Sequence, residues 1–299
     1  MADVWGRVVD RLDEHFAEGS SRQHSIAGRR IGAFEPIECR PRHCVYIDGG
    51  NAPIFESPSA CVQLIRVAAV EYDGAERRAT HRKEALCIVT SSPEGYRIDW
   101  SGQEWPSLSL VQANDLTVAT AADIARRVTE KAFASAFQCL AVFDGDLESR
   151  HAVEQAVLDG LTLPHCGLAK TSTLLTDQGQ SATAALLRAG PKEAWIHPLA
   201  DSRAVVKLHA LSRRAYLLDA RNILLPDAAS ALCGTNDASF PGYPYGLVEA
   251  DRLARVTVRE QHALAELLRT RLRGRWQEQS GALDAHEVLD SIAGSSSQK

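Results

Sequence analysis

Apolar residues along this chain recur with two periods, one typical of helices and one typical of strands. Between residues 4 and 16 they recur every three or four positions, which predicts an amphipathic helix at the N-terminus. After a polar, basic stretch come three apolar runs separated by turn-rich links, at residues 44–48, 61–74 and 85–92. Short links favour neighbouring strands that run in opposite directions, so these runs predict an antiparallel meander.

The rest of the chain alternates predicted helices with predicted strands. Residues 119–138 are alanine-rich, with apolar positions at helical spacing, and they predict a helix. A long helix is expected from about residue 240 to residue 273, and a last short one in LDAHEVLDSIAG. Further helices are expected near 149–159 and 180–189, and strands at 140–144, 166–170, 194–199, 204–210 and 215–220.

This order of elements begins as a meander and continues as strand–helix–strand units. It predicts an α/β fold with a mixed sheet, helices on both faces, and added N- and C-terminal helices. Ribonuclease-H-like folds have this order. We expect an N-terminal helix and basic arm over residues 1–40, one elaborated domain over 41–292 and a disordered tail over 293–299, with no solenoid repeat.

Two of the predicted strands end in an aspartate followed by glycine. In CVYIDGGNAPIF, Asp48 precedes Gly49-Gly50-Asn51, residues that tolerate unusual backbone angles and predict a sharp turn. LAVFDGDL repeats the pattern with Asp144. If the first and fourth strands are parallel neighbours, both aspartates lie at adjacent strand ends, the usual ligand position of an α/β sheet. Taken alone, IDGG is compatible with a metal ligand, a phosphate contact or a capped turn.

Two adjacent aspartates repel each other unless a cation or a shared proton lies between them. Hard oxygen ligands suit Mg²⁺ or Mn²⁺, and a pair of such ions about 4 Å apart can hydrolyse a phosphodiester. That chemistry needs three or four carboxylates, and the further candidates are Glu130 and Asp251. Each also has an ordinary interpretation, because a helical glutamate is commonly solvated and an aspartate in the first turn of a helix stabilises the helix dipole.

Two other residues could act on a phosphate. Lys170 follows a short strand in GLAKTS, where it could neutralise carboxylates, hold a phosphate or simply be exposed. Tyr243, in FPGYPYGLVEAD, could orient a phosphate, stack on a base or pack the turn. A phosphate loop of the GxxxxGK[ST] type is absent from the sequence.

Composition narrows the class of protein. The chain has 299 residues, 45% of them apolar and 24% charged, as in an ordinary globular protein. It lacks an apolar signal core and a run long enough to span a membrane, so we expect a cytoplasmic protein without a membrane contact. The net charge of −5 argues against non-specific nucleic-acid coating. Weak support for an anionic partner comes from basic clusters at residues 29–30, 40–43, 77–83, 126–127, 213–214 and 269–275.

The cysteines and histidines show no spacing typical of a metal site. Seven cysteines are scattered without a CxxC pair, mostly inside apolar runs, which predicts reduced thiols and no zinc site. We interpret the scattered histidines as structural: His43, His165, His197 and His209.

In combination, these motifs resemble the NurA nuclease family over roughly residues 40 to 292. VYIDGGNAPI is similar to the opening strand of that family with its metal aspartate, and LAVFDGDL to its second aspartate strand. GLAKTS resembles its lysine strand, GYPYGLVEADRLARV its late tyrosine motif, and HEVLD its closing segment. By this resemblance the metal ligands are Asp48, Glu130, Asp144 and Asp251, and Lys170 and Tyr243 complete the catalytic set.

The resemblance implies a ribonuclease-H-like fold and Mn²⁺-dependent (or Mg²⁺-dependent) cleavage of DNA with two ions, by 5′-to-3′ exonuclease and single-strand endonuclease activities. It also implies a homodimer that docks on a HerA-type hexameric helicase/translocase in DNA end resection and repair. Lys170 would stabilise charge on the phosphorane, and Tyr243 would position the scissile phosphate. Family members commonly have histidine at the position of Asp251, where ribonuclease H itself has aspartate. Asp123 is the alternative to Glu130.

Two other classes of function are compatible with the sequence. Sugar-kinase or actin-like ATPases share the core fold and also have aspartate-glycine turns at two strand ends. They normally have two such domains and a glycine-rich adenosine-binding stretch, which this chain lacks. A scaffold that binds DNA or a partner ATPase without cutting is the other alternative.

Overall fold

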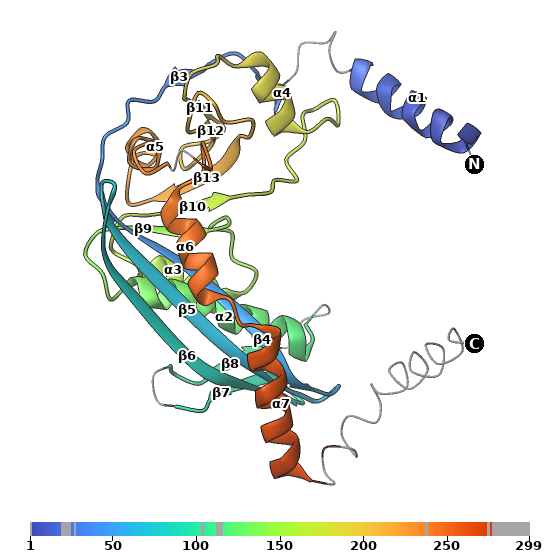
Figure 1. Ribbon diagram of the computed structural model, residues 1–299, viewed down its shortest axis with the longest axis vertical. Coiled ribbons are helices and arrows are strands. Elements are labelled where there is room, and N and C mark those ends of the chain that lie inside the picture. Colours follow the sequence, from blue (N-terminus) through green and yellow to red (C-terminus); the bar gives the residue numbers. More distant parts are fainter. Residues whose placement is uncertain are drawn as a thin grey trace.

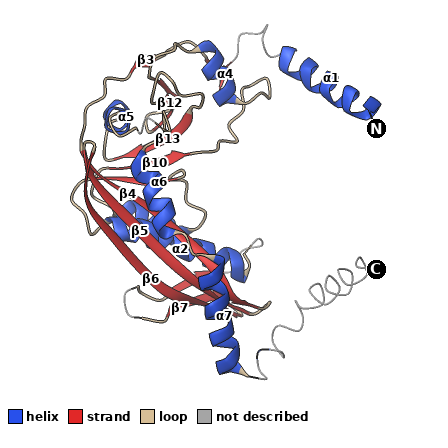
Figure 2. Cartoon of the chain, viewed as in Figure 1, coloured by secondary structure: helices blue, strands red, loops and turns tan. Residues whose placement is uncertain are grey.

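A computed structural model describes residues 2–18, 25–26, 28–102, 105–111, 116–236, 239–273 and 276. Its main feature is one eleven-stranded sheet in the order β3-β11-β12-β13-β10-β9-β4-β5-β6-β7-β8 (Figures 1 and 2). A separate pair is formed by β1 (Ser25–Ile26) and β2 (Arg29–Arg30). The strands of the sheet are β3 (Glu35–Pro36), β4 (His43–Glu56), β5 (Ala60–Asp73), β6 (Glu76–Ser92), β7 (Gly95–Trp100), β8 (Leu108–Val111), β9 (Leu140–Asp144), β10 (His165–Ala169), β11 (Trp195–Pro198), β12 (Arg203–Lys207) and β13 (Tyr216–Arg221).

The predicted meander is present, but its strands are longer than the apolar runs indicated. β4, β5 and β6 pair antiparallel over almost their whole length and form the long curved sheet in Figure 1. The prediction of a sharp turn after Asp48 is wrong, because β4 continues through Gly49 and Gly50 to Glu56. The two glycines are extended strand residues paired with Val67 and Arg66 of β5.

The centre of the sheet is parallel. β9 lies between β4 and β10 and runs parallel to both, whereas the other neighbouring strands of the sheet are antiparallel. This confirms a mixed sheet in which the first long strand is beside the fourth. Ile47 pairs with Phe143, so Asp48 and Asp144 follow directly at the same level of the sheet.

Helices cover both faces of the sheet, as predicted. α2 (Val118–Ala134) and α3 (Ala152–Gly160) enclose a core with Val45, Ile47 and Phe143 on one face. α5 (Leu225–Cys233) and α6 (Tyr245–Ala254) enclose a second core on the other face, with Tyr46 and Val142. α4 (Ala182–Ala189) packs against the β11–β13 end. The added terminal helices are α1 (Ala2–Glu18) and α7 (Val258–Leu272).

The long helix expected from residue 240 to residue 273 is two helices, so that prediction is wrong. α6 ends before Arg255, whose backbone is extended, and α7 begins after Thr257. The side chain of Thr257 accepts from the backbone N–H of Glu260, and the Glu260 side chain accepts from the N–H of Thr257. This reciprocal cap stabilises a new helix start. α5 was not foreseen, and the short helix expected in LDAHEVLDSIAG and the tail lie outside the described residues.

The expectation that all cysteines are reduced is wrong for one pair. The structure joins Cys39, which precedes β4, to Cys233 at the end of α5 by a disulfide. These positions are far apart in the chain and meet only because α5 packs beside the segment that leads into the sheet, so their spacing gave no signal. The remaining five cysteines are free and buried.

Among the described residues, no helix combines the length and the apolar character needed to cross a membrane.

Candidate metal centre

Three aspartates from distant parts of the chain meet at the middle of the sheet. Asp48 comes from β4, Asp144 from the end of β9 and Asp251 from α6. Each can offer a carboxylate oxygen such that the three atoms lie within 4.8 Å of one another. All three side chains are partly buried, so the cluster is sheltered but open to solvent. The structure therefore brings together three of the four carboxylates that the sequence suggested as metal ligands.

α6 can deliver Asp251 because it packs very close to β4. Gly246, in the first turn of α6, lies directly against the ring of Tyr46, and a Cβ at that position would overlap the ring. The Tyr46 ring is fully buried and its hydroxyl donates to Thr235, so it has no room to move aside. Position 246 thus requires glycine for close contact between helix and sheet, and this contact sets the depth at which Asp251 enters the site.

Glu130 lies beside Asp48 but points into a different set of contacts. Its carboxylate is buried between α2 and β4, where a Cβ on Gly49 would overlap it. Arg126, one turn earlier on α2, donates to Glu130 and also to the carbonyl oxygen of Gly49 at 3.0 Å. Asp123, three residues before Arg126 on α2, accepts from the same guanidinium at 2.9 Å. Glu130 is thus a neighbour of the three aspartates, and Arg126 already matches the charge of Glu130.

The cluster is electrostatically strained without a cation. Burial, followed by the negative charges of Glu130, Asp144 and Asp251, raises the pKa of Asp48 from 3.8 to about 8, against the hydrogen bond from the Gly49 N–H. Burial also raises the pKa of Glu130, although Arg126 and Lys131 oppose the shift. A carboxyl with the pKa of Asp48 holds a proton near neutral pH unless positive charge is supplied.

Lys170 and Tyr243 both contact Asp144. Lys170 follows β10, and its ammonium group donates to Oδ2 of Asp144. The Tyr243 hydroxyl donates to Oδ1 of the same carboxylate at 3.1 Å, and the lysine nitrogen lies 5.3 Å from the centre of the Tyr243 ring. Burial opposes the charge on Lys170, but the hydrogen bond and charge of Asp144 raise its pKa overall. Burial, then Asp144, raises the pKa of Tyr243, which stays a neutral phenol.

The remaining acidic residues near Asp144 point elsewhere. Asp146 accepts from the backbone N–H of Glu148 at 3.2 Å, and Glu148 pairs with Arg203 at 2.7 Å. Arg126 was missed as a residue of the site: the sequence showed it only as part of a basic cluster, and its position four residues before Glu130 was the available signal.

Many of the basic clusters seen in the sequence are compensated by acidic side chains in the fold. The pairs include Arg40–Glu38, Arg77–Glu249, Arg78–Asp73, Arg82–Glu84, Arg127–Glu154 and Arg269–Glu266.

A mixed sheet with two aspartates on a parallel central pair of strands, covered on both faces by helices, defines a ribonuclease-H-like α/β fold. Within that class, the chain is similar to the NurA nuclease from Sulfolobus solfataricus, with 11% identity and a TM-score of 0.55 over 91% of this chain and 97% of that one. A second NurA structure matches with 8% identity and a TM-score of 0.60 over 92% and 98% of the two chains. A NurA structure with manganese matches with 9% identity and a TM-score of 0.58 over 90% and 99%.

The predicted resemblance is confirmed at the level of the fold: this protein has the NurA fold over nearly its whole length. No family model and no curated protein sequence matches the chain. At such low identity the likeness concerns the arrangement of the backbone, so activity has to be argued from the side chains of the site.

Proposed function

We propose that this protein is a divalent-metal-dependent nuclease that hydrolyses DNA phosphodiesters. The observation that carries the proposal is the convergence of Asp48, Asp144 and Asp251 within 4.8 Å on the parallel strand pair. Among the described residues, the positive charge at the cluster is incomplete: Lys170 pairs with Asp144, and Arg255 pairs with Asp251 at 3.0 Å. Among the described residues, Asp48 accepts only a backbone N–H bond, from Gly49.

The donor set fits Mn²⁺ or Mg²⁺. All ligands are carboxylate oxygens, which hard divalent ions prefer. The raised pKa of Asp48 supports this choice, because a cation would stabilise the charged carboxylate. Bound ions would activate water and stabilise the leaving oxygen of a phosphodiester. We propose Mn²⁺ with two ions, held by Asp48, Asp144 and Asp251, with Glu130 completing the set when Arg126 releases it.

The neighbouring side chains have separate proposed roles. Lys170 orients Asp144 and, since its ammonium group is partly exposed, presents positive charge toward the equatorial oxygens of the phosphate. Tyr243 is buried, and its hydroxyl is directed to Asp144, so it acts on the scissile phosphate by orienting that carboxylate. Arg126 keeps Glu130 charged and in place.

The finer parts of the proposal rest on the resemblance to the NurA family. They are 5′-to-3′ exonuclease and single-strand endonuclease activities, a homodimer, a cytoplasmic location, and action with a HerA-type hexameric translocase in DNA end resection. The NurA neighbours include a nuclease and a manganese-containing structure, and both are similar to this chain over about nine-tenths of its length.

The experiment is a cleavage assay on end-labelled single-stranded and double-stranded DNA with Mn²⁺, Mg²⁺ or chelator. It compares the wild-type protein with Asp48→Asn, and with Asp201→Asn as a matched control on an exposed loop. We expect metal-dependent cutting that Asp48→Asn abolishes and Asp201→Asn retains. Undiminished cutting by a folded Asp48→Asn variant would overturn the assignment.

Measurements of DNA binding and of ATP binding on the same protein separate the alternatives. Metal-dependent DNA binding without cutting, repeated in the presence of a HerA-type translocase, would identify a scaffold. Saturable ATP binding by the protein alone would favour the sugar-kinase or actin-like class.

A further inference from the structure

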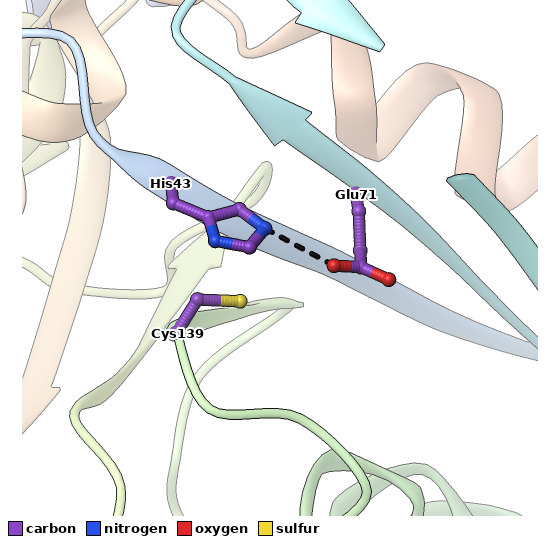
Figure 3. Close-up of side chains that lie close together, drawn as sticks. All are labelled: His43, Glu71 and Cys139. Atoms are coloured by element: carbon purple, nitrogen blue, oxygen red, sulfur yellow. Dashed lines mark hydrogen bonds and ion pairs between the residues drawn. The ribbon is translucent and has the colours of Figure 1, made fainter. Parts of the chain in front are cut away.

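A second cluster of ionisable side chains lies at the start of β4. His43 on β4, Glu71 on β5 and Cys139 just before β9 can each offer one ligand atom, and these three atoms lie within 4.8 Å of one another. Figure 3 shows the three side chains turned toward one another, with Nε2 of His43 3.0 Å from Oε2 of Glu71. The donors are an imidazole nitrogen, a carboxylate oxygen and a sulfur.

The sheet register brings these residues together. Glu71 on β5 is directly opposite Val45 on β4, so these two side chains lie on the same face. His43 is two residues before Val45, and alternate residues of a strand share a face, so His43 and Glu71 both point to the face that carries α2. Cys44 pairs with Leu140 in the parallel ladder, which places Cys139 beside His43. Cys139 is 7% exposed and belongs to the core on the α2 side. The cluster is thus fixed by two strand pairings and not by a flexible loop.

His81 on β6 adds a fourth group. Its Nε2 is 2.7 Å from Oε1 of Glu71, so the Glu71 carboxylate is shared between two imidazoles. The His81 ring packs edge-on against Phe137, with the ring centres 5.2 Å apart, which holds its orientation. Carboxylates that bind metals are commonly held by such a second hydrogen bond.

We propose that Nε2 of His43, a carboxylate oxygen of Glu71 and the sulfur of Cys139 bind one Zn²⁺ ion, with His81 positioning Glu71 and water in the fourth position. Mixed nitrogen, oxygen and sulfur donors suit zinc, whereas the all-oxygen cluster at Asp48 suits Mn²⁺ or Mg²⁺. Tetrahedral zinc ligands lie roughly 3.3–3.8 Å apart, so zinc would lengthen the 3.0 Å contact between His43 and Glu71 slightly and keep all three atoms within the observed 4.8 Å.

The charges balance in this site. Binding forms a zinc–sulfur bond as the Cys139 thiol releases its proton to solvent, and a zinc–nitrogen bond as His43 carries its proton on Nδ1. The thiolate and the Glu71 carboxylate together neutralise the two positive charges of the ion. His43 has a side chain that is 50% exposed, which gives the ion a route from solvent to the buried sulfur.

This zinc site would be separate from the proposed nuclease centre. Asp48 is five residues farther along β4, about 16 Å at the usual rise per strand residue. The bound ion would tie β4, β5 and the segment before β9 together, so zinc is expected to raise the melting temperature. The inference does not depend on the protein cutting DNA.

The experiment is a Co²⁺ titration of the full-length protein, freed of metal and kept under argon. Cobalt bound to a thiolate gives a charge-transfer absorption in the near ultraviolet that carboxylate-bound cobalt lacks. We expect one such cobalt per chain, displaced by Zn²⁺. Cys139→Ala is expected to abolish the band, and His43→Ala to weaken binding at least tenfold. The band should persist in Cys166→Ala, a control that removes another buried free cysteine, and in Asp48→Asn.

Absence of the thiolate band in the wild-type protein would overturn the proposal, as would an unchanged band in Cys139→Ala. Cobalt binding that is lost in Asp48→Asn and unaffected by His43→Ala would assign the metal to the aspartate cluster and also overturn it. Because His43 is half-exposed, the histidine variant keeps the test decisive if Cys139→Ala fails to fold. A hydrogen-bonded His–Glu–His cluster without metal affinity would give no band at any cobalt concentration.

Discussion

Strand β4 carries a cluster of ionisable groups near its middle and another at its start, and the two differ in how their charge is balanced. Around Asp48, burial and then the facing carboxylates raise the pKa of Asp48 to about 8. Around Glu71, a single carboxylate lies between His43 and His81 at hydrogen-bonding distance. The carboxylates of the first cluster face one another with little compensating charge, whereas the second cluster has hydrogen bonds among its own groups, one of which the proposed zinc ion would replace at His43. The two clusters thus differ in donor chemistry as well as in charge: carboxylate oxygens alone suit Mn²⁺ or Mg²⁺, whereas nitrogen, oxygen and sulfur together suit zinc.

The most severe way to break the aspartate cluster is Asp144→Asn. It removes the carboxylate that contacts Lys170 and Tyr243, and we expect DNA cleavage to fall on the order of 10³-fold because a ligand charge is lost. The measurement is the initial rate at saturating Mn²⁺, with Asp201→Asn as the control. A fall of less than threefold would mean that the cluster is not the reaction centre.

Gly246→Ala tests whether close packing of α6 creates the aspartate cluster. The added methyl group overlaps the buried Tyr46 ring, so we expect the free energy of unfolding to fall by ~3 kcal/mol and Mn²⁺ to bind more weakly as Asp251 shifts. Urea denaturation measures the first effect and calorimetry the second. Gly160→Ala, where a Cβ meets open space, is the matched control and should stay within ~0.5 kcal/mol.

The effect of Gly246→Ala should be confined to the face of the sheet that α6 covers. The cobalt–thiolate band of the His43 cluster is expected to persist in this variant, because α6 packs on the opposite face of the sheet. If the variant lost both the cobalt–thiolate band and Mn²⁺ binding, it would disrupt the whole sheet and not the α6 contact alone.

The pH dependence of stability sharpens the contrast in charge balance. The Asp48 pKa is about 8 in the folded chain and near 3.8 when unfolded, so between these values the folded state binds the extra proton. Stability of the metal-free protein therefore falls as pH rises from about 4 to about 8. Asp48→Asn lacks this loss and should be more stable than wild type by ~2 kcal/mol at pH 9, a fraction of the full shift because solvent screens the site.

Denaturation in chelator at pH 5 and pH 9 measures this difference. The stabilisation by Asp48→Asn should be small at pH 5, where the wild-type carboxyl is mostly protonated. If the free energy of unfolding differed between the two proteins by the same amount at pH 5 and at pH 9, the charge of Asp48 would already be neutralised in the fold.

The smallest expected effect is that of Tyr243→Phe. The change removes the hydroxyl that orients Asp144 and leaves the packed ring, so we expect kcat to fall about tenfold with little change in stability. Tyr245→Phe, two residues later and partly exposed, is the control. A loss as large as that of Asp144→Asn would mean that the hydroxyl contacts the reacting phosphate itself.

The sequence predicted the mixed sheet and the adjacency of Asp48 and Asp144, because both follow from the order of strands and helices. It did not predict that β4 runs on past Gly49, because glycine is compatible with a turn and with an extended strand, and the pairing with β5 that selects the strand is a long-range contact. The break after α6 was also missed, since apolar spacing continues across Arg255. The proximity of His43 to Cys139 depends on strand register, which no local pattern contains.

Because α6 supplies Asp251, the aspartate cluster is assembled from both halves of the chain. A nascent chain that ends before α6 carries Asp48 and Asp144 on a partial sheet but lacks the third carboxylate and the helix that covers Tyr46. Translation must therefore pass residue 254 before the proposed nuclease can hold its metal. Fragments that end before α6 would therefore lack one of the three proposed metal ligands.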